Sequence, residues 1–169
     1  MQSRIREGGA EILPCADDFP RPDNTVLCLP FQAGDEQFVY SANTPTIEKL
    51  LREANLGTMR PVLKGQLRYR DEQSIVWLGP ILFFSAAALA ENPNLMSIAL
   101  GVISNYLTDF FRGTSTPNPE VKLDVIQEIT PKKKFRHAVY SGPVAGLSSL
   151  PEVLRTTFKE FESQEKENG

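Results

Sequence analysis

The stretch IVWLGPILFFSAAALAENPNLMSIALGVISNYLTDFFRG, residues 75–113, decides the fold because so much of it is apolar. Seventeen residues from Ser74 to Ala90 and fourteen from Leu95 to Thr108 carry no charge. A membrane-spanning helix needs about 20 apolar residues, so the first run is marginal in length. Gly79-Pro80 interrupts it and is typical of the end of a strand. We therefore expect two buried helices of a water-soluble core, with a membrane-inserting hairpin over 75–111 as the alternative.

Local signals divide this stretch into a strand and two helices. Ile75 to Leu78 has the composition of a short interior strand, and Ile81 to Ala90 is an apolar segment of helix length. Asn92-Pro93 stops that segment, because the residue before a proline avoids helical backbone. The pattern then predicts a helix over Leu95 to Arg112, capped by Asn94 and closed by Gly113.

Alternating residues from Leu63 to Arg70 predict another strand before Ile75, so this unit begins strand–strand–helix, and the sequence on either side repeats that order. Upstream, two strands (Thr25 to Phe31 and Gln37 to Ser41) precede a helix that begins at Thr44-Pro45 and ends at Gly57. Downstream, the predicted strands are Val121 to Ile129 and Phe135 to Ser141, and the last helix is Leu150 to Phe161. Three strand–strand–helix units predict an α+β fold, an antiparallel sheet of hairpins covered by helices that include a central apolar helical hairpin. We expect an irregular segment over 1–24, one domain over 25–161 and a charged tail over 162–169.

Composition limits the class of protein and its partners. Of 169 residues, 41% are hydrophobic and 23% charged, which is typical of a globular domain. The formal net charge of −3 offers no general attraction for nucleic acid, which we do not expect as a partner. Two cysteines cannot build a disulfide framework, and the first residues lack a secretory signal, so we expect a cytoplasmic protein.

The sequence contains no recognisable catalytic, metal or cofactor motif. With one histidine, His137, and no Cys-x-x-Cys pair, the usual zinc ligand sets are excluded. A nucleophile elbow of the form Gly-x-Ser-x-Gly and the glycine-rich phosphate loops are also missing. We therefore expect no enzymatic activity and no cofactor. The alternative, an enzyme with an unrecognised site, would have to use His137, Cys28 or Asp109.

Two surfaces could bind a partner. The first is a basic patch formed by a strand and a hairpin tip, if these are adjacent. Its residues are Lys64, Arg68, Arg70, Lys132, Lys133, Lys134 and Arg136. The alternative is that these side chains are solvated and protect an edge strand. The second surface is an apolar face of the helix over 95–112. Its residues are Leu95, Ile98, Val102, Tyr106 and Phe110.

Residues 95–161 resemble the effector-associated constant components, small accessory proteins encoded beside effectors in bacterial conflict systems. The shared layout is a small-residue apolar helix (Leu95 to Phe111), two strands and a final helix. The resemblance covers less than half of the chain and carries over no catalytic residue. It implies an adaptor that couples to an effector, with antiphage defence as one setting. We thus expect a non-enzymatic adaptor that binds a protein partner or forms a homo-oligomer, with membrane insertion as a less favoured alternative.

Overall fold

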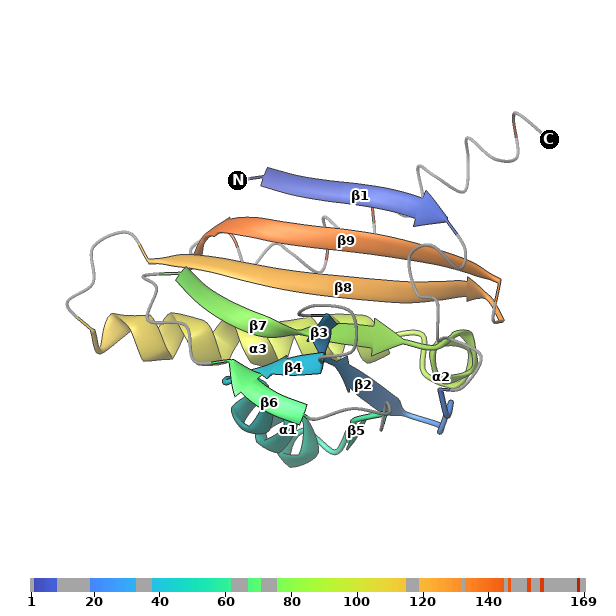
Figure 1. Cartoon of the computed structure of the whole chain (residues 1–169), viewed down its shortest axis with the longest axis horizontal. Helices are drawn as coiled ribbons and strands as arrows, with labels where there is room; N and C mark the ends of the chain where they lie inside the picture. The colour runs from blue at the N-terminus through green and yellow to red at the C-terminus, as the bar shows by residue number, and fades with distance from the viewer. Residues whose placement is uncertain are drawn as a thin grey trace.

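The chain folds into an α+β structure in which helices cover one face of a mixed sheet (Figure 1). The computed structural model describes residues 2–8, 19–32, 38–61, 67–70, 76–114, 119–131, 133–144, 146, 152, 156 and 167, with the backbone alone for 2–8, 32, 38 and 67–70. The predicted last helix (150–161) and charged tail (162–169) lie outside these residues, apart from single positions. The α+β class predicted from the sequence is confirmed.

Among the described residues, the main sheet has six strands. In spatial order they are β1 (Gln2–Gly8), β9 (Lys134–Pro143), β8 (Glu120–Thr130), β7 (Val76–Phe84), β2 (Thr25–Leu29) and β5 (Gly57–Met59). A smaller sheet contains β3 (Phe31–Gln32), β4 (Phe38–Ser41) and β6 (Leu67–Arg70), in that order.

The sheets are mixed, whereas the sequence predicted antiparallel hairpins. The pairs β1–β9, β8–β9, β2–β7 and β3–β4 are antiparallel. In contrast, β7–β8, β2–β5 and β4–β6 are parallel. A parallel pair needs a crossover connection, and helices supply it between β2 and β5 and between β7 and β8. The hairpin prediction thus holds for β8–β9 and, for the end of the first predicted strand, for β3–β4; it fails for the parallel pairs.

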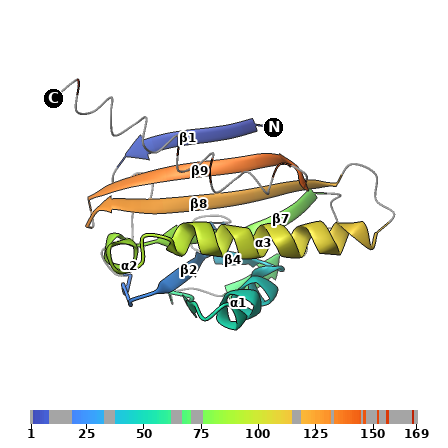
Figure 2. The ribbon, with the colours of Figure 1, turned by 180° about the vertical axis from the view of Figure 1, so that it is seen from behind.

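Three helices lie on the same side of the main sheet (Figure 2). They are α1 (Thr44–Glu53), α2 (Ala86–Glu91) and α3 (Leu95–Arg112). In α2, the Ser85 side chain accepts a hydrogen bond from the backbone N–H of Ala88 at 3.1 Å, as an N-cap residue does. The predicted bounds of the helix, Leu95 to Arg112, are confirmed. Asn94 occupies the N-cap position without a capping hydrogen bond from its side chain, and Gly113 at the C-cap has right-handed backbone, with a φ of −82°.

The first uncharged run folds differently from its prediction. Strand β7 continues through Gly79-Pro80 to Phe84, with a register irregularity between Leu78 and Ile81. A bulge accommodates a proline because its missing N–H no longer interrupts the ladder. As a result, the expected ten-residue helix over 81–90 is reduced to α2, and the central helical hairpin is shorter than predicted.

Helix α1 ends earlier than predicted, through an asparagine. Asn55 has a φ of 64°, the left-handed conformation of a helix C′ residue. The backbone N–H groups of Leu56 and Asn55 bond to the carbonyls of Leu51 and Arg52 at 3.0 Å each, the two bonds of a Schellman motif. Gly57, the predicted end of the helix, instead begins β5.

The N-terminal residues predicted to be irregular include a strand. Residues Gln2–Gly8 pair antiparallel with β9 over seven positions, from Gln2 opposite Ser141 to Gly8 opposite Phe135. The prediction for 1–24 is therefore wrong for these residues. The partner strand lies more than 120 residues away in the sequence, so the local sequence pattern could not predict the pairing.

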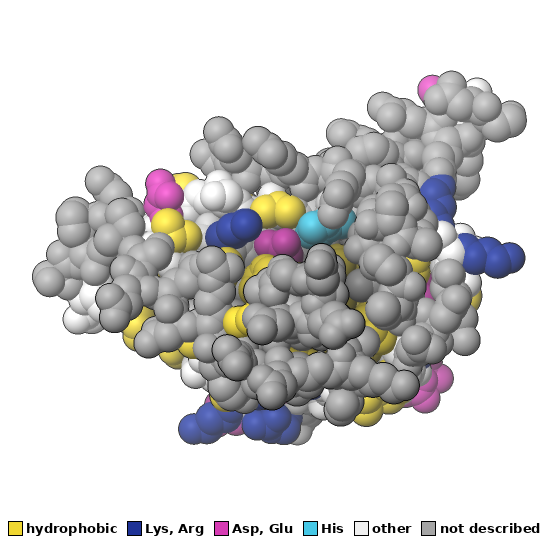
Figure 3. Space-filling model, viewed as in Figure 1, with side chains coloured by type: hydrophobic (Ala, Val, Ile, Leu, Met, Phe, Trp, Pro, Cys, Tyr) yellow, Lys and Arg dark blue, Asp and Glu magenta, His cyan; other side chains and the backbone are white. Residues whose placement is uncertain are grey.

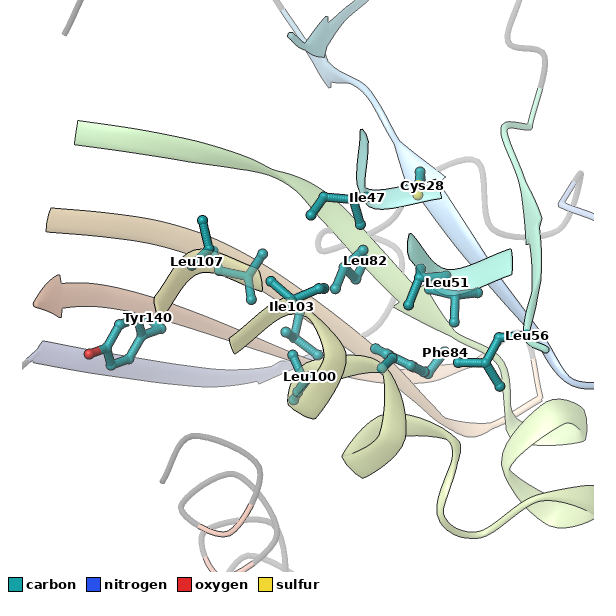
Figure 4. Close-up of a cluster of buried hydrophobic side chains, with 14 of the residues drawn as sticks. Cys28, Ile47, Leu51, Leu56, Leu82, Phe84, Leu100, Ile103, Leu107 and Tyr140 are labelled. Atoms are coloured by element: carbon teal, nitrogen blue, oxygen red, sulfur yellow. The ribbon is translucent and has the colours of Figure 1, made fainter. Parts of the chain in front are cut away.

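The main core lies between the helices and the sheet (Figure 4). Because side chains alternate along a strand, Val121, Leu123 and Val125 of β8 face the helices. On the helix side, Ile103 and Leu107 of α3 are fully or almost fully buried. The opposite face of the sheet carries a second, smaller cluster that includes Phe19, Leu27, Phe83, Ile126 and Phe135.

A buried ion pair links the segment before β2 to the end of β8. The Arg21 guanidinium donates to both carboxylate oxygens of Glu128, at 2.7 Å from Nη2 to Oε2. The same carboxylate accepts the backbone N–H of Ala86 at the beginning of α2. Because the Glu128 side chain is fully buried, the positive charge of Arg21 and the donated hydrogen bonds compensate the carboxylate for its loss of hydration.

Candidate functional site

The outer face of α3 carries the large apolar side chains that remain exposed in the described part of the chain. Ile98 is 40% exposed and Phe110 is 45% exposed. The opposite face of the helix packs into the core. Its buried residues are Leu95, Ala99, Leu100, Ile103, Ser104 and Leu107. Figure 2 shows α3 as the element nearest the viewer on this side of the molecule. Ile98 and Phe110 are therefore the candidates on α3 for contact with a partner.

Four apolar side chains at intervals of four residues follow α3, and we call Ile98, Val102, Tyr106 and Phe110 the α3 stripe. Each step of four residues turns about 40° around the helix axis, so Phe110 lies about 120° around the helix from Ile98. Between them, Tyr106 packs against the main core. Val102 and Tyr106 are half-buried. The rings of Tyr106 and Phe110 are stacked, with centroids 5.9 Å apart and an interplanar angle of 30°. Leu95, which the sequence placed on this face, is fully buried, because it is a core residue at the start of the helix.

The surroundings of the stripe are polar without being charged. Ser97, Asn105 and Thr108 are exposed neighbours on α3. Charges appear only in the last turn, where Arg112 Nη1 lies 3.7 Å from Asp109 Oδ1 and both side chains are about three-quarters exposed. Asp109 is thus a solvated surface acid rather than a buried catalytic group. The stripe is suited to an apolar, uncharged partner.

The predicted basic patch is not one surface. Arg136 is fully buried, which contradicts its assignment to the patch; it lies inside β9, two positions beyond the hairpin turn, where neighbouring strands flank it on both sides. Lys133 is exposed and Lys134 half-buried at that turn. Arg68 and Arg70 belong to β6 in the smaller sheet, far from the turn in Figure 1. Lys64 and Lys132 lie outside the described residues.

The one histidine is paired with an aspartate that the sequence did not single out. His137 Nε2 and Asp124 Oδ2 are 3.0 Å apart, and the two side chains are 13% and 10% exposed. The β8–β9 register brings them together, because Ile126 lies opposite His137 and Asp124 opposite Val139. The two side chains are diagonal neighbours on the sheet face away from the helices. Figure 3 shows the histidine beside an acidic side chain on that face.

Asp124 can orient the imidazole of His137, but the Cys28 thiol is too far away to form a nucleophile–base pair with that imidazole. A carboxylate bonded to one ring nitrogen fixes the tautomer and the orientation of a histidine. The other oxygen of the carboxylate, Asp124 Oδ1, is buried without a hydrogen-bond partner. Cys28 packs in the core on the helix side of the sheet, opposite to the face of His137. A Cys28–His137 nucleophile pair is therefore ruled out by the fold. In the sequence, Lys122 and Asp124 alternate with apolar residues, which places Asp124 on the sheet face away from the core. This alternation is the signal that could have indicated a contact between Asp124 and His137.

Burial makes the Cys28 thiol unreactive. It raises the pKa of Cys28 from 9.0 to about 12, and the nearby Glu48 carboxylate adds to the increase. Arg60 partly opposes it; its Nε donates to Glu48 Oε1 at 2.9 Å. The guanidinium also lies 5.2 Å above the ring centre of Tyr40, a cation–π contact. These groups stabilise the core next to α1 rather than preparing a thiolate.

The described ranges contain neither a metal-binding cluster nor a membrane-spanning helix. No group of three or more His, Cys, Asp and Glu side chains there is placed to hold a metal ion. None of the helices in these ranges has the length and hydropathy to cross a membrane.

Known proteins offer no similar sequence or structure from which a function could be transferred. The chain matches no family model, and no curated protein sequence or solved structure is significantly similar to it.

Proposed function

We propose that this protein is a non-enzymatic interaction component that binds a protein partner through the α3 stripe. The observation that carries the proposal is the exposure of two large apolar side chains, Ile98 and Phe110, on one helix. Monomeric proteins seldom leave a contiguous apolar patch with a polar border unless it binds something. Aromatic side chains such as Tyr106 and Phe110 are also enriched in protein interfaces.

The surroundings of α3 support a role as a stable platform. Its inner face is anchored by buried residues such as Leu100 and Ile103, so the helix does not have to order on binding. The resemblance of residues 95–161 to accessory components of bacterial conflict systems supports the same function. On this proposal the chain is a cytoplasmic adaptor of a bacterial complex, with antiphage defence as the setting that the resemblance implies.

The test is capture of the tagged full chain from its native host without detergent, compared with an Ile98→Asp variant. Ala87→Asp is the matched control, because it introduces the same charge at an exposed site near the start of α2, away from the stripe. A stoichiometric protein that is recovered with the wild type and the control, and lost with Ile98→Asp, supports the proposal. Equal recovery with all three chains would contradict it.

A second candidate function is catalysis at the Asp124–His137 pair. The observation that favours it is the 3.0 Å contact between Asp124 and the one imidazole of the chain. An oriented imidazole is a general base if a substrate can reach it. His137→Gln and Asp124→Asn should then each abolish the cellular phenotype while the purified variants remain folded. Two silent substitutions would exclude this candidate.

A further inference from the structure

We propose that the sheet face away from the helices binds a small carboxylate that carries a hydrogen-bond donor on the adjacent carbon, which is the chemistry of an α-amino or α-hydroxy acid. The donor of the ligand bonds to Asp124 Oδ1, and the carboxylate of the ligand lies against the ammonium group of Lys122. This site is separate from the α3 stripe, and it uses the Asp124–His137 pair without requiring catalysis. Three observations support it: a buried carboxylate oxygen without a partner, an exposed lysine beside it, and basic positions on the neighbouring strand.

Asp124 has one oxygen that no group in the described part of the chain satisfies. Its Oδ2 lies 3.0 Å from His137 Nε2, whereas its Oδ1 is buried and has no hydrogen-bond partner. Buried carboxylate oxygens are nearly always paired, because an unpaired one loses its hydration without compensation. Since the Asp124 side chain is only 10% exposed, Oδ1 is a position at which a bound donor would be stabilising.

A small molecule can reach this oxygen from the outside. Figure 3 shows the histidine at the surface, in a row with an acidic and a basic side chain. The terminal torsion of an aspartate side chain turns at low cost, so a small rotation of Asp124 presents Oδ1 to a ligand. A protonated amine is the strongest donor for this oxygen, because a hydrogen bond between opposite charges is about twice as strong as a neutral one. A hydroxyl group is the weaker donor.

Lys122 supplies a positive charge for the carboxylate of the ligand. It is exposed and lies two positions before Asp124 in β8, so both residues belong to the same face of the sheet. Two residues of a strand span roughly 7 Å, so a donor and a carboxylate on neighbouring carbons reach both side chains together. An anion without a donor would instead bring a negative charge next to Asp124 and leave Oδ1 unpaired.

The register of β1 adds positive charge beside this site. Arg4 and Arg6 lie opposite Val139 and His137 of β9. Because opposite residues of an antiparallel pair share a sheet face, these two positions belong to the face of Asp124. A chain with a formal net charge of −3 thus has a local group of basic positions here, and these attract the carboxylate of a ligand.

The experiment is an NMR titration of the purified, untagged full chain, followed through the imidazole signals of His137. These signals need no further assignment, because the chain has one histidine. Three probes of nearly equal size differ in the donor: glycine carries an ammonium group, glycolate a hydroxyl group, and acetate neither. With so few contacts, we expect saturable shifts with glycine at about 1–10 mM. Glycolate should bind more weakly, and acetate at least about tenfold more weakly than glycine.

Two variants test the two ends of the ligand. Asp124→Asn removes the charge that receives the amine, so glycine binding should weaken at least about tenfold. Lys122→Met keeps an unbranched side chain without the charge, and glycine binding should weaken about fivefold or more. Lys49→Met is the matched control, because Lys49 is exposed on α1, on the other side of the sheet; this variant should bind glycine like the wild type. Far-UV circular dichroism confirms that each variant is folded.

Three outcomes would overturn the proposal. Equal binding of glycine and acetate would leave a plain anion site, and no saturable shift with glycine up to about 100 mM would leave no site for this ligand class. The third outcome is a Lys122→Met variant whose His137 signals are displaced without any ligand, together with a wild type that does not respond to glycine. It would mean that Lys122 itself pairs with Asp124 in solution. Because the titration uses the isolated protein, each of these failures leaves the capture test of the α3 stripe unaffected.

Discussion

The inner and outer faces of α3 are both apolar, yet only one of them is covered. The inner face places Leu100, Ile103 and Leu107 against the sheet, each at 1% exposure or less. The outer face leaves Ile98 at 40% exposure, and Phe110, near the end of the helix, is 45% exposed. Because a helix that is apolar around most of its circumference has no preferred side, periodicity alone could not tell these faces apart. The neighbours of the helix, which come from distant strands, decide which face is core.

Placing the same acid on each face gives the strongest test of the difference in burial between the two faces of α3. Ile103→Asp buries a carboxylate among apolar side chains without a partner, and we expect it to cost more than about 5 kcal/mol of unfolding free energy. That approaches the whole stability of a domain, so the variant should be largely unfolded. Ile98→Asp, on the outer face, should lose about 1 kcal/mol or less. Urea denaturation followed by circular dichroism measures both. Similar losses from the two variants would mean that the outer face is also core.

The thiol of Cys28 reports whether the core beneath α3 opens. Its pKa of about 12, against 9.0 without burial, lowers the thiolate fraction at pH 8 about a thousandfold, so alkylation by iodoacetamide should slow by at least that factor relative to the unfolded chain. Peptide mapping by mass spectrometry separates Cys28 from Cys15. Rapid labelling of Cys28 under native conditions would contradict a closed core.

The same shift predicts a pH dependence. The unfolded chain loses the Cys28 proton near pH 9.0, while the folded chain retains it up to about 12. The contribution of Cys28 to stability is therefore fully present below pH 9.0 and is lost as the pH rises from there toward 12. A Cys28→Ala variant should show a smaller fall in unfolding free energy over this window. An unchanged fall would assign the pH dependence to other groups.

The sequence predicted the elements whose signals are local. The bounds of α3 follow from an apolar run between Asn94 and Gly113, and the alternation in β8 follows from its own residues. Strand β1 could not be predicted, since its partner β9 lies at the other end of the chain. The end of β7 was misplaced because Gly79-Pro80 is a turn signal that the sheet accommodates as an irregularity in register.

The candidate site was predicted in part for the same reason. Neighbouring members of the α3 stripe are four residues apart, so the sequence could group them in pairs, but the direction turns by about 120° between Ile98 and Phe110. It could not exclude Leu95, whose burial depends on neighbouring elements. The Asp124–His137 contact and the burial of Arg136 both depend on how β8 and β9 are placed in the sheet, which the local pattern does not specify.

A smaller effect is expected where α1 ends beside the inner core. Asn55 has a φ of 64°, a conformation in which a Cβ is unfavourable and asparagine or glycine is preferred. Asn55→Ala should therefore cost about 1 kcal/mol of unfolding free energy, whereas Asn55→Gly should change it by less than about 0.5 kcal/mol. The difference in urea midpoint between the two variants measures the conformational term, since both lose the same side chain. Equal midpoints would show that the helix end adjusts its backbone.

The smallest predicted effect has the opposite sign and tests the openness of the outer face. Gly101→Ala adds a methyl group that meets no atom within 4 Å beyond its chain neighbours and its own helix backbone, so it should raise stability by up to about 1 kcal/mol through helix propensity. Gly57→Ala is the contrasting variant, because its Cβ would lie 2.5 Å from Thr25 Oγ1 and should lower stability. Thermal unfolding measures both. If Gly101→Ala destabilised the protein, the outer face of α3 would be packed against its own chain, and the distinction between the two faces would be lost.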